Sequence, residues 1–421
     1  MRQNRLITAG MALLLMLAGV SAVSAGNISF SGYVRNYTGI LIDSDPLDYS
    51  QVQNTFDIKA DYSGDMGDLH TEGFVYLDAE NNLTAGIREL YADIYFNSLD
   101  LRIGKQQIIW GKGDGVFITD VVSPKDMSNF ILPDFDEIRI GVTAAKADWY
   151  VGDFTLEGVW IPVFTPSVLP DSDSIWAVSM DFPAGMTPSI KSAKLPDPTF
   201  KNSEGFAKLS YMGSSFDVEL IGGYMWDDTP VPHVTTFVPG MPPTVVVTPE
   251  YHRLSMAGGS FSTEILGVVF RGEGAYYDGN YFSIDPDKLQ TNLLADGDGT
   301  LQKNYLHYMA GMDYSLFGIN LSAQFVQQVI LDYDSRLKND EYESTATFLA
   351  AKTFLNETLK VQFFGYYGIN NNDALLRPSV SYSIADGLDV TAGSDIFIGD
   401  SGTFGQYDNN DMVYIKIKYS F

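Results

Sequence analysis

The sequence contains no cysteine, so it can form neither a disulfide framework nor a thiolate metal site, and it has no thiol nucleophile. Beyond its first segment it has no apolar run long enough for a membrane-spanning helix, which needs about 20 residues. Basic residues are scarce as well, since 26 Lys and Arg stand against 53 Asp and Glu, for a formal charge of -27. A polyanion needs a basic surface to bind, so nucleic acid is excluded as an expected partner.

The first residues have the features of a secretory signal peptide. Arg2 and Arg5 precede an apolar run from Leu6 to Val20, and small residues follow up to Ala25. This run is short for a transmembrane helix and is not followed by a stop-transfer pattern, so we expect residues 1–25 to be removed. Residues 26–421 then form a single domain that is exported to the cell envelope.

The rest of the chain consists of segments in which apolar and polar residues alternate, which is the period of a β-strand. In the last segment the two faces are formed by Val413, Ile415, Ile417, Tyr419 and Phe421 and by Tyr414, Lys416, Lys418 and Ser420. In a soluble sandwich the apolar face would cover a core. In a transmembrane barrel it would face lipid, and the polar face would line a watery lumen. The alternation alone leaves both folds open.

The connections decide between these folds, because short and long links alternate along the whole chain. Tight turns are expected at 63–65, 97–99, 151–153, 213–215, 266–267, 317–318, 356–358 and 385–387. The other links are 43–50, 79–85, 112–138, 165–202, 229–250, 283–303, 332–341, 370–374 and 401–410. Short turns at one rim and longer loops at the other are typical of outer-membrane barrels. The sequence therefore predicts an all-β fold, a transmembrane antiparallel up-and-down β-barrel of 18 strands, with 16 as the alternative and both termini at the periplasmic rim.

Two motifs carry a resemblance to known families. The chain ends in Tyr419-Ser420-Phe421, and this terminal aromatic resembles the carboxy-terminal signature of Gram-negative outer-membrane barrels. That resemblance implies recognition by the barrel assembly machinery. The segment Leu101–Gly115 is similar to a strand of alginate-export-type and related uncharacterised large barrels, in which the strand runs into a long loop that enters the lumen. The resemblance implies a channel of about this size. The strong acidity departs from the alginate-export pattern, so alginate is not the expected substrate.

The loop 112–138 is the strongest candidate for a functional element. Its apolar residues need a place to bury, so we expect the loop to fold into the pore and narrow it rather than to be a disordered surface loop. Charge there would set selectivity. The charged residues expected to narrow the pore are Asp114, Asp120, Lys125, Asp126, Asp134, Asp136 and Glu137. The run Ser123-Pro124-Lys125-Asp126 has the pattern of a helix start and predicts a short helix near 123–131.

A second candidate is a set of polar residues on the lumen face of neighbouring strands. The expected pore-lining residues are Arg35, Lys59, Glu89, Asp93, Arg102, Gln106, Lys416 and Lys418. Opposed basic and acidic groups would create a transverse field that orients polar solutes. They could equally pair with one another and fill the interior, and the two interpretations are compatible.

Two extracellular loops, 165–202 and 229–250, are unusually apolar. Residues 234–247 within the second have the pattern of a projecting hairpin. Exposed apolar surface often marks a site for a partner or an apolar ligand, whereas packing of one loop on the other is the simpler interpretation.

The sequence offers little for metal binding or catalysis. Asp296 and Asp298 lie in a stretch that resembles the start of a calcium loop, but the downstream Glu is missing, so we expect at most loosely bound Ca²⁺ at the extracellular loops and no cofactor. Catalysis of the expected kind needs a nucleophile, a base and an orienting group together, and the four histidines provide no such set. We therefore expect no enzyme.

The function that these features favour is an outer-membrane channel through which small solutes diffuse. The alternatives are an anchor or interaction protein that binds a partner through its apolar loops, or a transporter of hydrophobic compounds. Outer-membrane lipids and lipopolysaccharide are the expected surroundings. Whether the protein forms a homo-oligomer stays open at this point.

Overall fold

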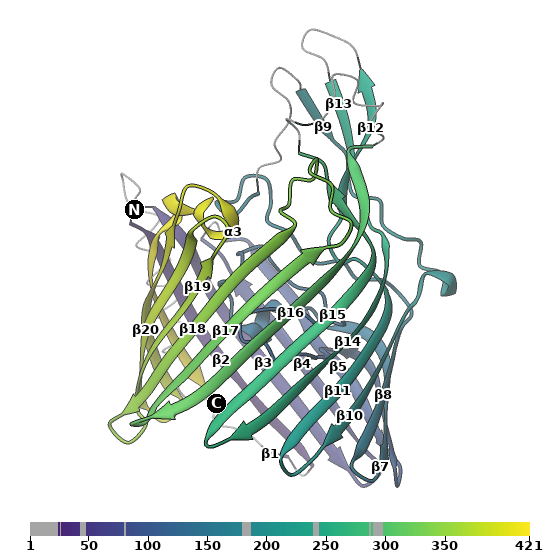
Figure 1. The fold of residues 1–421 in the computed structure, drawn as a ribbon. Helices are drawn as coiled ribbons and strands as arrows, with labels where there is room; N and C mark the ends of the chain where they lie inside the picture. Colours follow the sequence, from purple (N-terminus) through teal and green to yellow (C-terminus); the bar gives the residue numbers. More distant parts are fainter. Residues whose placement is uncertain are drawn as a thin grey trace.

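The computed structural model describes residues 24–25, 27–42, 48–79, 81–178, 187–238, 244–285, 288 and 298–421. Eighteen antiparallel strands close into a barrel (Figure 1), which confirms the predicted fold class and the higher of the two strand numbers. Each strand pairs with the next one along the chain, and the barrel closes where β22 pairs with β2. The predicted signal peptide lies almost entirely outside the described residues and stays a prediction.

The barrel strands vary from 8 to 17 residues. They are β2 (Ile28–Leu41), β3 (Tyr49–Gly64), β4 (Gly67–Leu77), β5 (Leu83–Tyr95), β6 (Leu99–Gln106), β7 (Val142–Val151), β8 (Phe154–Ile161), β10 (Glu204–Met212), β11 (Phe216–Trp226), β14 (Arg253–Ile265), β15 (Val268–Ser283), β16 (Thr300–Leu316), β17 (Ile319–Ile330), β18 (Tyr342–Phe354), β19 (Leu359–Gly368), β20 (Asp373–Ala385), β21 (Leu388–Ile398) and β22 (Met412–Ser420). The short strand β1 (Ser24–Ala25) pairs with the beginning of β2.

The connections alternate between short and long, as the sequence predicts. Turns at the rim where β2 begins and β22 ends have two to four residues, whereas the links at the other rim include 162–203 and 227–252. The turn at Leu266 and Gly267 shows why such turns are tight, because both residues have positive φ angles of 54° and 80°. Two consecutive residues of this kind match the right-handed twist of the strands that they join.

The outer face of the barrel is a band of exposed apolar side chains. On β11, for example, Leu220 and Tyr224 point outward and are 60% and 54% exposed, while the next residues, Ile221 and Met225, point inward and are buried. The other strands repeat this alternation, with exposed Phe, Leu, Ile, Val and Tyr on the outside. An apolar surface of this extent is stable only against lipid. Among the described residues, no helix has the length and apolar character needed to cross a membrane.

A separate three-stranded sheet projects beyond the barrel at the long-loop rim (Figure 1). It consists of β9 (Thr187–Ile190), β12 (Val231–Val238) and β13 (Thr244–Glu250), and β9 lies parallel to β13. The predicted projecting hairpin is therefore confirmed. The strand β9 belongs to the other apolar loop, so the two loops do pack on each other.

The predicted helix near 123–131 is wrong. Ser123 uses its hydroxyl to bind the backbone of Ile108, so it caps no helix. The backbone of Lys125 and Asp126 bridges to Arg139 and Val168 instead of coiling. These long-range backbone pairs replace the local hydrogen bonds of a helix. The helices among the described residues are short, namely α2 (Phe135–Ile138), α3 (Gly402–Gly405), η1 (Phe200–Asn202) and η3 (Asp408–Asn410).

The lipid-facing band yields a test of the barrel's orientation in the membrane. Leu220 lies near the middle of β11, so Leu220→Arg should lower the free energy of unfolding in lipid vesicles by about 2–4 kcal/mol, the cost of a charge at the bilayer midplane. Ser379→Arg places the same side chain on the inner face of β20 and should cost much less. Equal losses in the two variants, measured by denaturant unfolding, would show that the outer face does not meet lipid.

Candidate functional site

The link between β6 and β7 contacts widely separated parts of the barrel wall, and we call residues 107–141 the crossing segment. It begins five residues before the loop predicted at 112–138, because Ile108 and Trp110 leave the sheet. The backbone of Gln107 and Ile108 donates to Glu89 and Ser123 instead of to a neighbouring strand. Both Ile108 and Trp110 are then buried inside the barrel.

The first half of the crossing segment packs against an apolar part of the inner wall. Its buried side chains Ile108, Trp110, Ile118 and Val122 contact a cluster from β7, β8, β10, β11 and β14 to β17. The indole of Trp110 also donates a hydrogen bond of 2.8 Å to Glu157 on β8. The lumen is therefore not polar throughout. Apolar inward positions occur where the crossing segment needs a surface to bury its own apolar side chains.

The second half of the crossing segment packs on another side of the barrel. Phe130 and Leu132 lie in an aromatic cluster with Trp176, Phe397 and Tyr407, contributed by a long loop, β21 and the last loop. Arg377 on β20 donates hydrogen bonds of 3.2 and 2.9 Å to the carbonyl oxygens of residues 131 and 132. The segment thus reaches across the interior from the wall around β15 to the wall around β20.

Charged side chains of the wall hold the backbone and the acidic groups of the crossing segment. Glu273 on β15 is buried and accepts hydrogen bonds from the backbone N–H groups of Lys112 and Thr119, each at 2.6 Å. On β2, Arg35 binds Glu137 through two bonds of 2.8 and 2.9 Å. Because the segment lacks a strand partner, such wall groups satisfy its buried backbone and charges.

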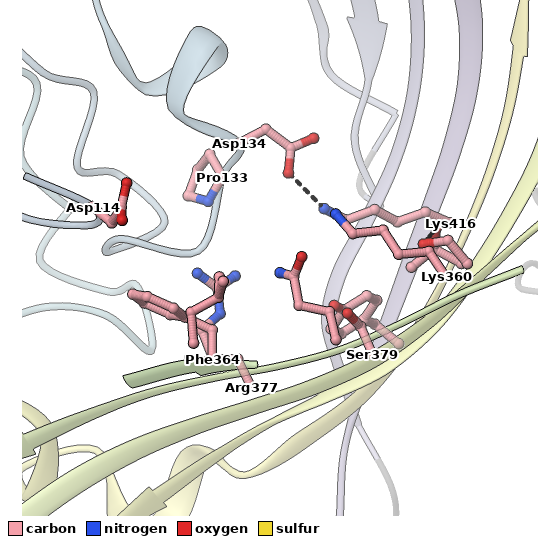
Figure 2. Close-up of a pocket in the computed structure, with 13 residues that line it drawn as sticks. Asp114, Pro133, Asp134, Lys360, Phe364, Arg377, Ser379 and Lys416 are labelled. Atoms are coloured by element: carbon pink, nitrogen blue, oxygen red, sulfur yellow. Dashed lines mark hydrogen bonds and ion pairs between the residues drawn. The ribbon is translucent and has the colours of Figure 1, made fainter. Parts of the chain in front are cut away.

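A cavity of about 530 Å³ lies between the tip of the crossing segment and the wall (Figure 2). Its lining is mostly polar and combines residues of the segment with residues of β18 to β22. These are Asp114, Pro133, Asp134, Leu349, Lys360, Gln362, Phe364, Arg377, Ser379, Ser381, Thr391, Tyr414 and Lys416. Asp134 and Lys416 face each other at 3.3 Å (Figure 2). A second cavity of about 80 Å³ is lined by residues of β2 to β5 and again by Pro133 and Asp134. The tip of the segment therefore lies between two polar spaces.

The residues predicted to line the pore are mostly paired in the structure. Arg102 binds Asp93 at 2.7 Å, and Lys59 binds Glu72 at 2.9 Å. Other members of the set contact the crossing segment or an aromatic ring. Arg35 binds Glu137, Lys416 binds Asp134, and Glu89 accepts a hydrogen bond from the backbone of Gln107. Lys418 lies 4.4 Å from the ring centre of Tyr33. Gln106 is fully buried and donates a hydrogen bond to the carbonyl oxygen of Ala144.

The charged residues predicted for the constriction loop separate into two groups. Asp114, Asp126 and Asp134 line one or both cavities. Asp120 and Lys125 serve the segment itself, because the amine of Lys125 donates to the carbonyl of Asp120, whose carboxylate binds Arg139 at 2.8 Å. The side chain of Asp136 lies outside the described residues. Sequence reasoning did not find Glu273 or Arg377, since no local pattern indicates which wall residue will meet a segment more than a hundred residues away.

A histidine cluster at the base of the projecting sheet was also missed. His233 binds Asp298 through Nδ1 at 2.6 Å, and its Nε2 lies 2.6 Å from Nε2 of His252. The ring of Tyr281 stacks on His252 at 3.9 Å. With the Nδ1–H directed at Asp298, Nε2 of neutral His233 accepts a hydrogen bond from His252. Asp296, the other residue of the predicted calcium stretch, lies outside the described residues, and calcium binding there stays a prediction.

The hydrogen bonds to Glu273 can be tested directly. Glu273→Gln keeps the shape of the side chain but replaces one acceptor oxygen with a donor, so we expect it to weaken the hold on Lys112 and Thr119. Bonds to a charged group contribute about 1.5–3 kcal/mol each, and amide hydrogen exchange in peptides covering residues 107–122 should become at least about tenfold faster. Glu219→Gln, which changes a carboxylate that accepts from Ser260 on β14, is the matched control and should leave this exchange unchanged.

The histidine cluster predicts a pH dependence. Burial, and then the neighbouring His233, lower the pKa of His252 below its usual value of 6.5. When the hairpin detaches, His252 regains its usual pKa of 6.5 and binds a proton below that pH, whereas His252 in the folded cluster stays neutral down to a lower pH. The folded cluster should therefore lose stability as the pH falls from 6.5 through the folded pKa of His252. Amides of β12 and β13 should exchange faster at about pH 5 than at about pH 7.5, after correction for intrinsic rates. His252→Gln should abolish this difference, and an unchanged difference in that variant would contradict the assignment.

The sequence and the structure were compared with those of known proteins. No curated protein matches the sequence. Among solved structures, Acinetobacter baumannii OccAB1 is similar with a TM-score of 0.56 and 10% identity over 95% of this chain and 98% of that chain. Pseudomonas aeruginosa OccK2 (OpdF), in complex with glucuronate, has a TM-score of 0.54 and 12% identity over 94% and 98%. Acinetobacter baumannii OccAB2 has a TM-score of 0.55 and 13% identity over the same shares.

These neighbours are outer-membrane porins, and at such low identity the likeness shows a shared fold. The lipid-facing band and the closed barrel agree with that location, because a strand can cross a membrane only when all its backbone groups are paired. The family described as "Protein of unknown function (DUF1302)" matches residues 49–421. The chain is therefore an outer-membrane β-barrel that belongs to the DUF1302 family.

Proposed function

We propose that the protein is an outer-membrane channel for small polar solutes, and that the crossing segment narrows its lumen. The observation that carries this proposal is the polar cavity of about 530 Å³ beside the segment tip. Apolar packing occupies the wall from β7 to β17, so a solute would pass on the side of β18 to β22, where the lining offers hydroxyl, amide and charged groups. Barrels of about this strand number leave a water-filled lumen.

The charge of the cavity favours solutes with a negative charge. Its acidic members are already paired with basic residues of the wall. Arg377 is paired with the buried Asp395. Lys360 has no ion-pair partner among the described residues, and its side chain extends into the cavity (Figure 2). The structure of OccK2 with glucuronate supports this preference, since a barrel of similar fold holds a small acidic solute. The resemblance to alginate-export-type barrels rests on the Leu101–Gly115 motif and stays a prediction.

Conductance across a planar lipid bilayer tests the proposal. The purified, folded protein should give stepwise ion currents, and replacing residues 112–138 by a short Gly-Ser linker should raise the conductance severalfold, because the obstruction is removed. Shortening the projecting hairpin at 231–250 is the matched control, since it removes a similar length of chain outside the barrel wall. Lys360→Glu should shift the reversal potential in a salt gradient toward cation preference. An intact fold without ion current, or equal conductance in the linker variant and the wild type, would refute the channel.

A second candidate function is an interaction role for the apolar loops. The projecting sheet β9, β12 and β13 extends beyond the barrel (Figure 1), and the loop that carries β9 exposes Ile190, Leu195 and Phe200. Exposed apolar residues at such a place suit a protein partner. The variant with the shortened hairpin separates the two functions, because an interaction role predicts a loss of function in the cell while conductance is retained.

A further inference from the structure

The inner wall near the short-turn rim carries a cluster of one histidine and three carboxylates on β3, β4 and β5, separate from the acidic groups of the crossing segment. His70 and Glu72 lie on β4, Glu89 lies on β5 and Asp61 lies on β3. The strand register brings them together, because Asp61 is opposite His70 and Glu72 is opposite Glu89. A β-bulge at Arg88 turns both Arg88 and Glu89 inward. We call His70, Glu72, Glu89 and Asp61 the His70 cluster.

The two ring nitrogens of His70 have different surroundings. Nδ1 is hydrogen-bonded to the carboxylate of Asp61. Nε2 lies 3.6 Å from Oε2 of Glu89 and 3.9 Å from Oε2 of Glu72. This Nε2 is buried and has no hydrogen-bond partner. The ligand atoms of His70, Glu72 and Glu89 all lie within 4.8 Å of one another.

This arrangement leaves an electrostatic problem. Because the Nδ1–H donates to Asp61, the lone pair on Nε2 of a neutral ring is directed at two carboxylates. The surrounding charges do not balance either. Five carboxylates, from Asp57, Asp61, Glu72, Glu89 and Asp93, face three cations, from Lys59, Arg88 and Arg102. A buried lone pair beside uncompensated negative charge is costly unless a cation lies between them. A divalent cation at this point would restore neutrality.

We propose that Nε2 of His70 and the carboxylates of Glu72 and Glu89 bind one divalent transition-metal ion such as Zn²⁺. Bonds of about 2.0–2.2 Å place tetrahedral ligands about 3.3–3.6 Å apart. Side-chain shifts from 3.6 and 3.9 Å at His70, and from within 4.8 Å between the two carboxylates, close the site. Imidazole favours Zn²⁺ over Ca²⁺ or Mg²⁺, which prefer oxygen ligands. Asp61 holds the ring in the required tautomer, as carboxylates behind metal-binding histidines do.

Two neighbouring contacts bear on the proposal. Lys59 places its amine 2.9 Å from Oε2 of Glu72, and its side chain is 39% exposed, so it can move aside when a metal binds. The backbone N–H of Gln107 donates to Oε1 of Glu89, which leaves Oε2 as the ligand atom. Water from the lumen completes the coordination. The site does not depend on the channel function, because it is formed by the wall alone.

Zinc binding to the untagged, folded protein in detergent tests the site, with heat-modifiable migration on gels as the check of folding. Isothermal titration with Zn²⁺ should show one site that excess Ca²⁺ does not displace. His70→Gln should weaken it at least tenfold, and Asp61→Asn should weaken it by about 10–100-fold because it removes a group that orients the ligand. His307→Gln is the matched control, since it removes a histidine from β16 on another part of the wall and should leave the affinity unchanged.

Several outcomes would overturn the site. Wild-type protein that binds no Zn²⁺ beyond the level of His70→Gln would show that a proton, and not a metal, neutralises the cluster. An equal loss in His307→Gln would place the binding elsewhere. Anomalous diffraction at the zinc edge gives a readout independent of affinity, with a peak expected within about 2.5 Å of Nε2 of His70. A peak at the acidic outer loops alone would refute the assignment.

Discussion

Complete pairing of the backbone is the constraint on which this structure depends. In lipid an unpaired N–H or C=O group has no water to bind, so strands can cross only as a closed sheet. Pairing between β22 and β2, from Tyr33–Ser420 to Leu41–Met412, removes the last free edge. Closure also fixes the side chains, because every second residue must then meet lipid. The exposed apolar band and the inward polar and charged positions follow from this single requirement.

Backbone groups inside the barrel do not face lipid, so they need no strand partner there. The barrel interior can therefore hold a long segment that belongs to no strand. The crossing segment buries apolar residues against an apolar part of the wall and satisfies its backbone with side chains. Glu273 accepts from two of its N–H groups, and Arg377 donates to two of its carbonyl oxygens. Buried charges are stable here because each has several partners. A segment held in this way is suited to define the narrow part of a channel, since its position does not depend on its own secondary structure.

The charged inner wall shows how pairing and function can share one surface. Opposed charges on neighbouring strands form close pairs, such as Arg102 with Asp93, and these fill much of the wall. Where pairing is incomplete, the remaining group is exposed to a ligand. Lys360 faces the larger cavity, and Nε2 of His70 faces two carboxylates. These two places carry the solute and metal proposals, and the second lies beside a β-bulge between β4 and β5.

The sequence by itself determined the barrel, a strand number of 18 or 16, the alternation of turns and loops, and the projecting hairpin. These features are local, because a period of two residues and the chemistry of tight turns can be read within a few positions. Only the tertiary structure decided where the long loop goes and what holds it. Ser123 begins a helix by pattern, yet it binds Ile108 because residues 125 and 126 pair with distant backbone. The partners of Lys112, His233 and His70 were hidden for the same reason. Their contacts depend on which strands lie close together in the closed barrel, and a local sequence pattern does not show which distant residues those are.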